Sequence, residues 1–471
     1  MTDTIINDNE ITFKNIEIKI FEYICEIGKK ITRNILEGYD KHLMKTRDKS
    51  AYRHKGYKHT TVKTVYGEVE YKRAVYEVEN EDGFKKHVFM LDEQLKIEGV
   101  GLISQNLAEK MVSGITELSY RECSKKVSET TGQTVSAMGT WNVIQKLGEA
   151  VCRDEQKLVN NYKAGNVKGN RVAKLLFEEA DGVYIKYQRE STLKGEIKVG
   201  LTYDGWRKIA EGRFALDGKV VVAGISNSTE FNSYREAAIA EKYDIDETEV
   251  RIMNADGSEW IKNVCDKDTL FQLDPFHKNK AIREKIHNRK AVTDIQDYLA
   301  KKDLEGMFKY LDMYIDSLSE DEEIKDAKEL RTYLTNNKKG LISYQDRGIK
   351  LPENGNGLVY RNMGTMENHI WSTIAKRMKH NHSSWSKKGG NNLAKILAKK
   401  CSGRLNEVAE KLRCGAFKRD VIEDLQKKET SASKAPRRDG KGYAYPVMGH
   451  LPGMNYKLTG TKVLLVKTAG N

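Results

Sequence analysis

The sequence has little of what secreted and membrane proteins depend on. Its six cysteines show no CxxC pair and no regular spacing, so we expect reduced thiols and no disulfide framework. No apolar run approaches the roughly 18 residues of a membrane span, and the first residues lack the basic and apolar regions of a signal peptide. Only five prolines occur, which argues against long disordered linkers. We therefore expect a soluble, cytoplasmic protein with no membrane partner.

Positive charge is the first feature that the sequence does have. The 471 residues include 81 Lys and Arg against 68 Asp and Glu, a net charge of +13 at pH 7. This excess favours polyanionic partners, because each Lys or Arg that meets a phosphate releases condensed counterions. Charge alone does not separate a nucleic-acid-binding protein from one that is merely basic.

The N-terminal region has the pattern of a long helix followed by a small sheet. Residues 14–45 place isoleucines on one helical face, which predicts a packing or dimerisation helix. A basic stretch over 45–58 leads into 60–79, where β-branched and aromatic residues around Gly67 predict two strands. This basic arm could contact a DNA backbone or could simply be solvated. The isoleucines of the helix are Ile16, Ile20, Ile24, Ile27, Ile31 and Ile35.

Residues 102–148 predict three short-linked helices. The second begins with the capping box Ser119 to Glu122 and ends near Gly132, and a third helix follows a short turn. Helix, glycine turn and helix is the helix-turn-helix arrangement, although three packed helices without a DNA role are common. If this region binds DNA, we expect polar contacts from Ser136, Thr140 and Asn142, and phosphate contacts from Lys125 and Lys126.

From about residue 171 the pattern changes to strands. Three strand-like segments, a helix at 231–245, a strand near 250–261, a short helix and a strand at 269–277 follow one another. Residues 279–345 then carry apolar stripes at helical spacing, which predicts an all-helical insertion. Further helices are expected at 364–380 and 404–428, and the polar tail from about 430 is expected to be flexible.

Three acids fall at informative places in this order. Asp181 lies at the polar break of the first strand, Asp256 follows the apolar part of the fourth, and Glu367 lies near the start of a later helix. Taken singly, Asp181 and Asp256 are better explained as cap or turn residues, and Asp-Gly is itself a turn dipeptide. Taken together on one sheet edge, three carboxylates could hold two Mg²⁺ ions for phosphoryl displacement. Glu178 and Glu179 precede Asp181 and are alternatives for the first acid.

Several segments resemble one known family. EADGVYI (179–185), NADGSEWI (254–261), LDPFHKNKAI (273–282), GTMENHIWSTIAKRM (364–378) and WSKKGGNNLAKI (385–396) look like the ISLre-type insertion-sequence transposases of bacteria. Those transposases lie near the Mutator-like DDE group with an RNase H-like catalytic domain. That group carries an Asp/Cys-x-x-His signature after the second acid, which here matches Asp274 to His277. The similarity covers most of the chain.

The resemblance implies a fold and a site. The fold would be an α/β RNase H-like core, a mixed sheet with flanking helices, that carries an all-helical insertion and follows an N-terminal α+β DNA-binding region. Asp181, Asp256 and Glu367 would be the catalytic, metal-binding triad, with Glu367 placed by analogy with the family motif. Asp274 and His277 would be an accessory pair, and His277 is not expected to be a metal ligand, because Mg²⁺ prefers oxygen.

The resemblance also implies partners. The protein would use Mg²⁺, with Mn²⁺ as a substitute, to cleave DNA at terminal inverted repeats and join the 3′-OH to target DNA. It would form a homo-oligomer in the bacterial cytoplasm and associate with the nucleoid when bound to DNA. The expected segments are an N-terminal region at 1–95, a helical DNA-binding region at 96–168, a first core part at 169–278, the insertion at 279–350, a second core part at 351–428 and a basic tail at 429–471.

Further basic residues after the third acid are candidates for DNA phosphate contacts. They are Lys376, Arg377, Lys387 and Lys388, and an ordinary solvated face explains them equally well. Trp371 and Trp385 could stack on an end base, although buried core aromatics are more common. Two other functions stay open: a metal-dependent nuclease of the same fold without strand transfer, and a DNA-binding regulator.

Overall fold

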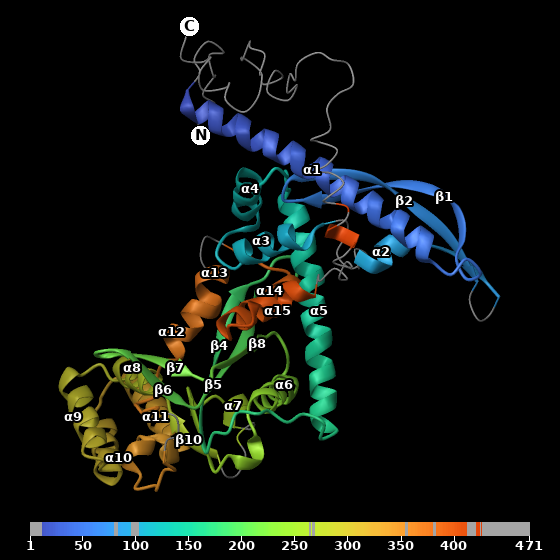
Figure 1. Cartoon of the computed structure of the whole chain (residues 1–471). Helices are drawn as coiled ribbons and strands as arrows, with labels where there is room; N and C mark the ends of the chain where they lie inside the picture. The colour runs from blue at the N-terminus through green and yellow to red at the C-terminus, as the bar shows by residue number, and fades with distance from the viewer. Residues whose placement is uncertain are drawn as a thin grey trace, which may run out of the picture. The chain divides into compact units, whose positions relative to one another are not determined.

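The structure is a computed structural model that describes residues 12–79, 83–95, 103–262, 265, 269–353, 357–379, 383–411, 421–423 and 425. It is a mixed α/β protein that divides into two compact units. Unit 1 contains the described residues of Met1–Ile115, Tyr120–Thr140 and Leu412–Asn471, and unit 2 contains those of Thr116–Ser119 and Trp141–Lys411. The elements are labelled in Figure 1. None of the helices within these described ranges has a stretch long and apolar enough to cross a bilayer.

Unit 1 combines a long helix with a three-stranded antiparallel sheet of order β1-β2-β3. Leu36 and Tyr39 of the helix pack against Val62, Val69 and Tyr71 of the sheet, which gives this unit an apolar core. Its elements are α1 (Phe13–Thr46), β1 (Arg53–Thr64), β2 (Gly67–Glu79), β3 (Lys85–Val88), α2 (Met90–Leu95), α3 (Gln105–Ile115) and α4 (Tyr120–Thr130).

The predicted N-terminal helix and hairpin are both confirmed, with two differences. Strand β1 begins at Arg53, so the expected basic arm is partly a strand, and β3 was not predicted. Several isoleucines of the predicted apolar face of α1 are not buried: Ile20, Ile24, Ile27 and Ile31 are 39–53% exposed. The spacing therefore predicted the helix correctly but overstated how much of that face is covered.

Unit 2 is built on a five-stranded mixed sheet of order β10-β9-β4-β5-β8. Strands β4, β9 and β10 run parallel to one another, whereas β5 is antiparallel to both β4 and β8. The elements of this part are α5 (Ala137–Lys163), β4 (Leu175–Lys186), β5 (Lys194–Tyr203), β6 (Gly205–Ala210), β7 (Arg213–Asp217), β8 (Val220–Gly224), α6 (Ser228–Lys242), β9 (Val250–Ala255), α7 (Glu259–Lys262) and β10 (Thr269–Leu273).

The predicted order of three strands, helix, strand, short helix and strand is confirmed. The β6-β7 hairpin between the second and third of these strands was missed, because its residues are mostly exposed and show no clean apolar alternation. One face of the sheet is covered by α6, where Phe231 and Ala238 pack against Leu176 and Val222. The opposite face carries a cluster of aromatic rings around Phe177.

A helical block follows β10 in the chain, as predicted. It contains α8 (Pro275–Lys285), α9 (Arg289–Ala300), α10 (Leu304–Asp316) and α11 (Asp321–Asn336), and it has an apolar core of its own that includes Ile295, Met307, Leu311, Leu330 and Leu334. The apolar stripes seen in the sequence supply this core.

The chain then forms shorter helices. They are α12 (Met366–Ile370), a π-helical turn (Trp371–Ala375), α13 (Lys376–Met378), α14 (Lys387–Cys401) and α15 (Leu405–Glu410). The helix predicted at 364–380 is thus interrupted by a π turn, a feature that often accompanies functional sites. Of the helix predicted at 404–428, α15 covers the start, and much of the rest and the predicted tail lie outside the described residues.

Candidate active site

Three aspartates form a row across the three parallel strands. Ala180 of β4 pairs with Ala255 of β9, and the N–H of Asp274 donates to the carbonyl of Ala255 at 2.8 Å. Asp181 and Asp256 therefore follow paired residues, and Asp274 continues the same row at the end of β10. Neighbouring strands in a sheet lie about 4.8 Å apart. The fold thus brings together residues that are 75 and 18 positions apart in the chain.

Asp256 ends its strand with a turn. Its Oδ1 accepts the N–H of Ser258 at 2.8 Å, and Gly257 has φ +84°, a conformation that favours glycine. The hydroxyl of Tyr333 donates to the Asp256 carbonyl at 2.9 Å. The Asp-Gly turn expected from the sequence is present, and from this turn the Asp256 carboxylate acts electrostatically on His277, as Asp181 and Asp274 also do.

The accessory pair links the third strand to the first. Asp274 is the N-cap of α8, because its Oδ1 accepts the N–H groups of Phe276 at 2.9 Å and His277 at 3.2 Å. His277 then lies with Nε2 3.3 Å from Oδ2 of Asp181. This hydrogen bond and the negative charges of the three aspartates raise the pKa of His277 above its usual value, although burial opposes them.

Glu179 is buried on the same face of β4 as Asp181, since it lies two residues earlier in the strand. Its Oε1 accepts hydroxyl hydrogen bonds from Tyr203 at 2.8 Å and from Thr365 at 2.6 Å. Its Oε2 accepts the backbone N–H groups of Thr365 and Met366, both at 3.1 Å. Burial raises the pKa of Glu179, and these hydrogen bonds act against that rise. Glu179 therefore caps the start of α12, the helix that carries Glu367.

Asn254 connects this cap to the aspartate row. Its Nδ2 donates to Oδ2 of Asp274 at 2.7 Å and lies 3.3 Å from Oε2 of Glu179, while its Oδ1 accepts from Nε2 of Gln272 at 3.1 Å. Asn254 and Gln272 were not among the site residues expected from the sequence. The available signal was an amide residue near the end of each of two neighbouring strands, VRIMNA and TLFQL, and these two residues are paired in the sheet.

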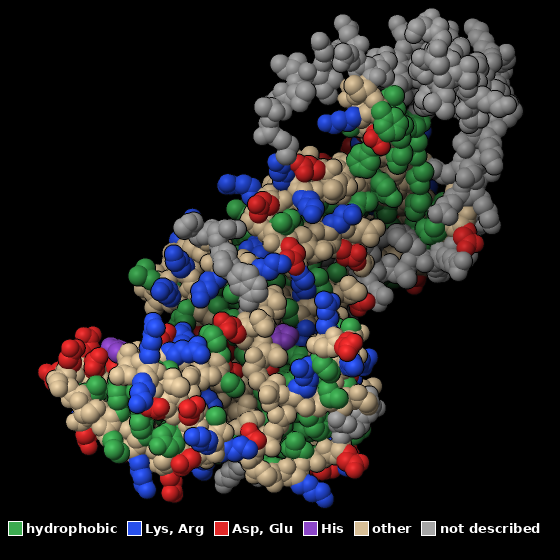
Figure 2. Space-filling model, turned by 90° about the vertical axis from the view of Figure 1, so that its left-hand side faces the viewer, with side chains coloured by type: hydrophobic (Ala, Val, Ile, Leu, Met, Phe, Trp, Pro, Cys, Tyr) green, Lys and Arg blue, Asp and Glu red, His purple; other side chains and the backbone are tan. Residues whose placement is uncertain are grey.

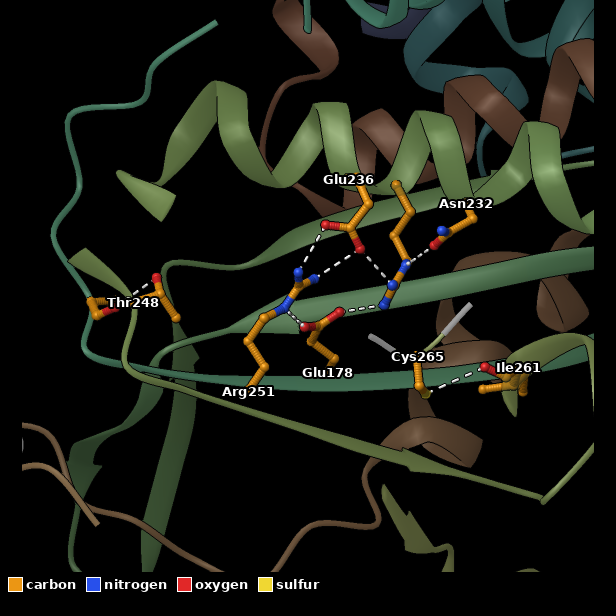
Figure 3. A network of polar contacts seen from close by, with 9 residues as sticks. Glu178, Asn232, Glu236, Thr248, Arg251, Ile261 and Cys265 are labelled. Carbon is orange, nitrogen blue, oxygen red and sulfur yellow. Dashed lines mark hydrogen bonds and ion pairs between the residues drawn. The ribbon is translucent and has the colours of Figure 1, made fainter. Parts of the chain in front are cut away.

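Glu178 points to the opposite face of the sheet, into a network of ion pairs (Figure 3). Arg251 donates to Glu178 Oε1 at 2.5 Å and to both oxygens of Glu236 at 2.8–2.9 Å, and Arg235 of α6 also pairs with Glu178. Burial acts to raise the pKa of Glu178, but Arg251 and Arg235 outweigh it and hold that pKa below its usual value. Glu178 is fully engaged there and is a poor alternative for the first acid of the site.

Glu367 is not gathered into the row. It lies exposed in the first turn of α12, and among the residues that the structure describes no three His, Cys, Asp or Glu side chains are arranged to hold a metal ion. Asp181 and Asp256 nevertheless fit Mg²⁺, which keeps several waters and is commonly bound by one or two carboxylates together with substrate phosphates. Two of the three predicted acids therefore follow paired residues of adjacent strands, and the helix that carries the third is capped by Glu179 of β4.

The DNA-contact candidates of the helical region have different environments. Lys125, Lys126 and Asn142 are exposed, and Ser136 is exposed with its Oγ accepting the N–H of Gly139 at 3.0 Å. Thr140 is fully buried, and its hydroxyl donates to the Ser136 carbonyl at 3.3 Å. A side chain in the core is not accessible to DNA, so the prediction that Thr140 contacts DNA is wrong.

The basic candidates near the third acid also differ. Lys376 is exposed and pairs with Glu117 at 2.8 Å, and Lys388 is exposed and pairs with Glu149 at 2.6 Å. Lys387 is exposed at the start of α14.

Arg377 and Trp385, by contrast, belong to the core. Arg377 is buried with its guanidinium 5.2 Å from the centroid of the Trp385 ring, so its predicted DNA contact is also corrected. Trp385 is buried and its Nε1–H donates to the Met378 carbonyl at 2.9 Å, as expected of a core aromatic. The side chain of Trp371 lies outside the described part.

Comparison with known proteins identifies the family. The model of an uncharacterised protein family (UPF0236) matches residues 6–412. A UPF0236 protein of Caldanaerobacter subterraneus subsp. tengcongensis is 25% identical over 449 residues, which cover 88% of this chain and 86% of the relative. A second protein of that organism, whose name joins eleven locus designations, is 24% identical over 442 residues, or 90% and 87% of the two chains. A Streptococcus gallolyticus relative, named as a UPF0236 protein in the vanSb 3′ region, is 24% identical over 352 residues, 72% of each chain. The chain described here therefore belongs to the UPF0236 family.

Proposed function

We propose that the protein is the DNA transposase of a bacterial insertion sequence, of the ISLre type, with an RNase H-like catalytic domain. The observation that carries the proposal is the position of Asp181 and Asp256, each directly after the paired residues Ala180 and Ala255 of adjacent parallel strands. The strand order, with an antiparallel β5-β8 pair on one side of β4 and parallel β9 and β10 on the other, supports the RNase H-like assignment.

The relatives add support of a different kind. The name of one relative joins eleven locus designations, which fits a gene carried at many places in one genome. Multiple copies are what a mobile element produces. The expected homo-oligomer and the binding of terminal inverted repeats stay predictions of this proposal.

The residues have separate tasks in this proposal. Asp181 and Asp256 would hold Mg²⁺, which supplies activation of a water or 3′-OH and stabilises the leaving oxygen. His277 fixes the orientation of Asp181 through the hydrogen bond at 3.3 Å. Glu179 fixes the start of the helix that carries Glu367, the proposed third acid.

The test is DNA cleavage and joining by the full-length protein. The substrate is a labelled linear duplex that contains the sequences flanking the gene, incubated with Mg²⁺ and a target plasmid. The wild type is compared with Asp256→Asn, which keeps an oxygen for the Ser258 N–H. Asp246→Asn is the matched control, because Asp246 is a largely exposed carboxylate in a surface ion pair.

We expect the wild type and Asp246→Asn to cut and join the DNA, and Asp256→Asn to do neither while still binding it. Equal cutting by all three proteins would show that Asp256 is only a turn residue. Cutting without joining would favour a nuclease, and binding without cutting by the wild type would favour a DNA-binding regulator.

A further inference from the structure

A cavity of about 470 Å³ in unit 2 has a lining that the aspartate row does not explain. Two aromatic rings, two amides, a guanidinium and a hydroxyl line it, and none of these six side chains carries a negative charge. They are Trp206, Phe214, Gln345, Arg361, Asn362 and Thr365. The volume is within the range of about 300–1,000 Å³ that is usual for small-molecule sites.

The β6-β7 hairpin builds the aromatic wall of this cavity. Trp206 pairs with Leu216 and Lys208 pairs with Phe214 in the antiparallel register, so the four side chains share one face of the hairpin. Trp206 is held firmly: its N–H donates to the Val359 carbonyl at 3.0 Å, and the carbonyl of Trp206 accepts the N–H of Val359 at 2.9 Å.

The Trp206 ring is fixed from behind by other rings. It packs edge-on at 4.9 Å from Phe177 and 5.0 Å from Tyr203, and Trp206 is buried. The Trp206 part of the wall is therefore in place before any ligand arrives, which lowers the entropic cost of binding.

The remaining groups suit a planar, hydrogen-bonding ligand. The Arg361 guanidinium lies 3.8 Å from the centroid of the Phe214 ring, and Gln345 and Asn362 present exposed amides. An amide offers both donors and an acceptor, as the edge of a nucleobase requires. Lys208, exposed on the same face as Phe214, supplies positive charge for a phosphate.

Thr365 connects the cavity to the aspartate row. It lines the cavity, and its hydroxyl and N–H both bind Glu179, which lies two residues before Asp181 on the same face of β4. Building on the proposed function, we propose that this cavity binds an unpaired nucleobase of the DNA strand that is presented to the aspartate row. Base stacking on an aromatic ring tolerates any sequence, so the site would recognise a single-stranded or frayed end.

The test uses the full-length protein and a duplex with a short single-stranded overhang that contains 2-aminopurine, whose fluorescence falls when it stacks. We expect wild-type protein to quench the overhang probe and to quench a probe with 2-aminopurine inside the duplex much less. Phe214→Ala should lose most of the quenching and bind the overhang about tenfold more weakly. Phe214→Leu, which keeps the packing without the aromatic face, serves as the second variant if Phe214→Ala does not fold.

A matched control variant shows whether the loss of quenching is specific to this cavity or follows from the loss of any exposed ring. Tyr184→Ala removes another exposed ring of the same unit and should quench and bind as the wild type does. Equal quenching by wild type, Phe214→Ala and Phe214→Leu, with duplex binding intact, would overturn this inference and leave the proposed function standing. Failure of the wild type to bind either DNA would overturn both.

Discussion

Two neighbouring glutamates of strand β4 are buried equally but have different kinds of partner. Glu178 faces α6 and is paired with two arginines, Arg235 and Arg251, whereas Glu179 faces α12 and is held by hydroxyl, amide and backbone donors. The first arrangement cancels charge with charge. The second satisfies hydrogen bonds without cancelling charge, on the face that also carries the aspartate row.

The difference separates acids that are paired with cations from acids that are held mainly by neutral donors. A buried carboxylate with two guanidinium partners stabilises the fold only while the set is complete. Carboxylates gathered with mainly neutral donors keep a negative potential, which suits a divalent cation and costs stability when none is bound. The ion pairs on the α6 face therefore contribute to folding. The carboxylates on the α12 face fit the metal-binding role that we propose.

We expect the largest effect from a substitution in the aspartate row. Asp181→Asn should reduce Mg²⁺-dependent DNA cleavage below detection, since one of the two adjacent carboxylates is lost. The same change should alter the free energy of unfolding little, because it removes a like charge from the row but also the charged partner of His277. Cleavage assays and urea unfolding of one preparation check both points, and a strongly destabilised Asp181→Asn would contradict the comparison.

We expect the next largest effect from a substitution in the ion-pair network around Glu178. Arg235→Met should lower the free energy of unfolding by about 3–5 kcal/mol, because it leaves part of a buried charge network unpaired. Urea unfolding measures the loss, and Arg283→Met, at an exposed arginine of α8, is the control. A loss no larger than that of the control would mean that the network contributes little to folding.

A third prediction concerns the cap on α12. Glu179→Gln should lower the free energy of unfolding by about 2–3 kcal/mol, since the amide cannot accept from all the buried donors around it. A double-mutant cycle with Thr365→Val tests whether the effect runs through this contact: the two losses should add to more than the loss of the double variant. Simple additivity would show that the cap does not depend on Thr365.

A substitution of His277 should have a smaller effect, on metal binding at the aspartate row. His277→Gln should weaken Mn²⁺ binding about tenfold, because the side chain that orients Asp181 is altered. Calorimetric titration with Mn²⁺ measures the affinity. His287→Gln, at an exposed histidine between α8 and α9, should bind Mn²⁺ as the wild type does. Unchanged affinity in both variants would make His277 a residue of the strand-to-helix junction alone.

The smallest effect expected is on that junction. Asp274→Ala should cost about 1 kcal/mol in the free energy of unfolding through the lost N-cap of α8. Thermal or urea unfolding detects a loss of this size, and no loss would show that the helix start is held by other contacts. Asp303→Ala, which removes the N-cap of α10, gives the matched reference.

Local pattern determined much of this fold by itself. The apolar spacing of residues 14–45 predicted α1 within a residue at each end, and the alternation after residue 171 predicted the strand and helix order of the sheet. The Asp-Gly turn and the acids at the strand ends were visible for the same reason, since turn chemistry and strand periodicity act between near neighbours.

Only the tertiary structure decided which acids lie close together and which groups pair with them. Glu178 and Glu179 are the same residue type in one strand, yet their partners come from α6 and β9 on one face and from 186 residues further along the chain on the other. The β6-β7 hairpin, the interruption of the helix at 364–380 and the burial of Thr140 and Arg377 likewise depend on packing between distant segments. Burial and pairing are set by long-range contacts, and no local spacing of residues encodes them.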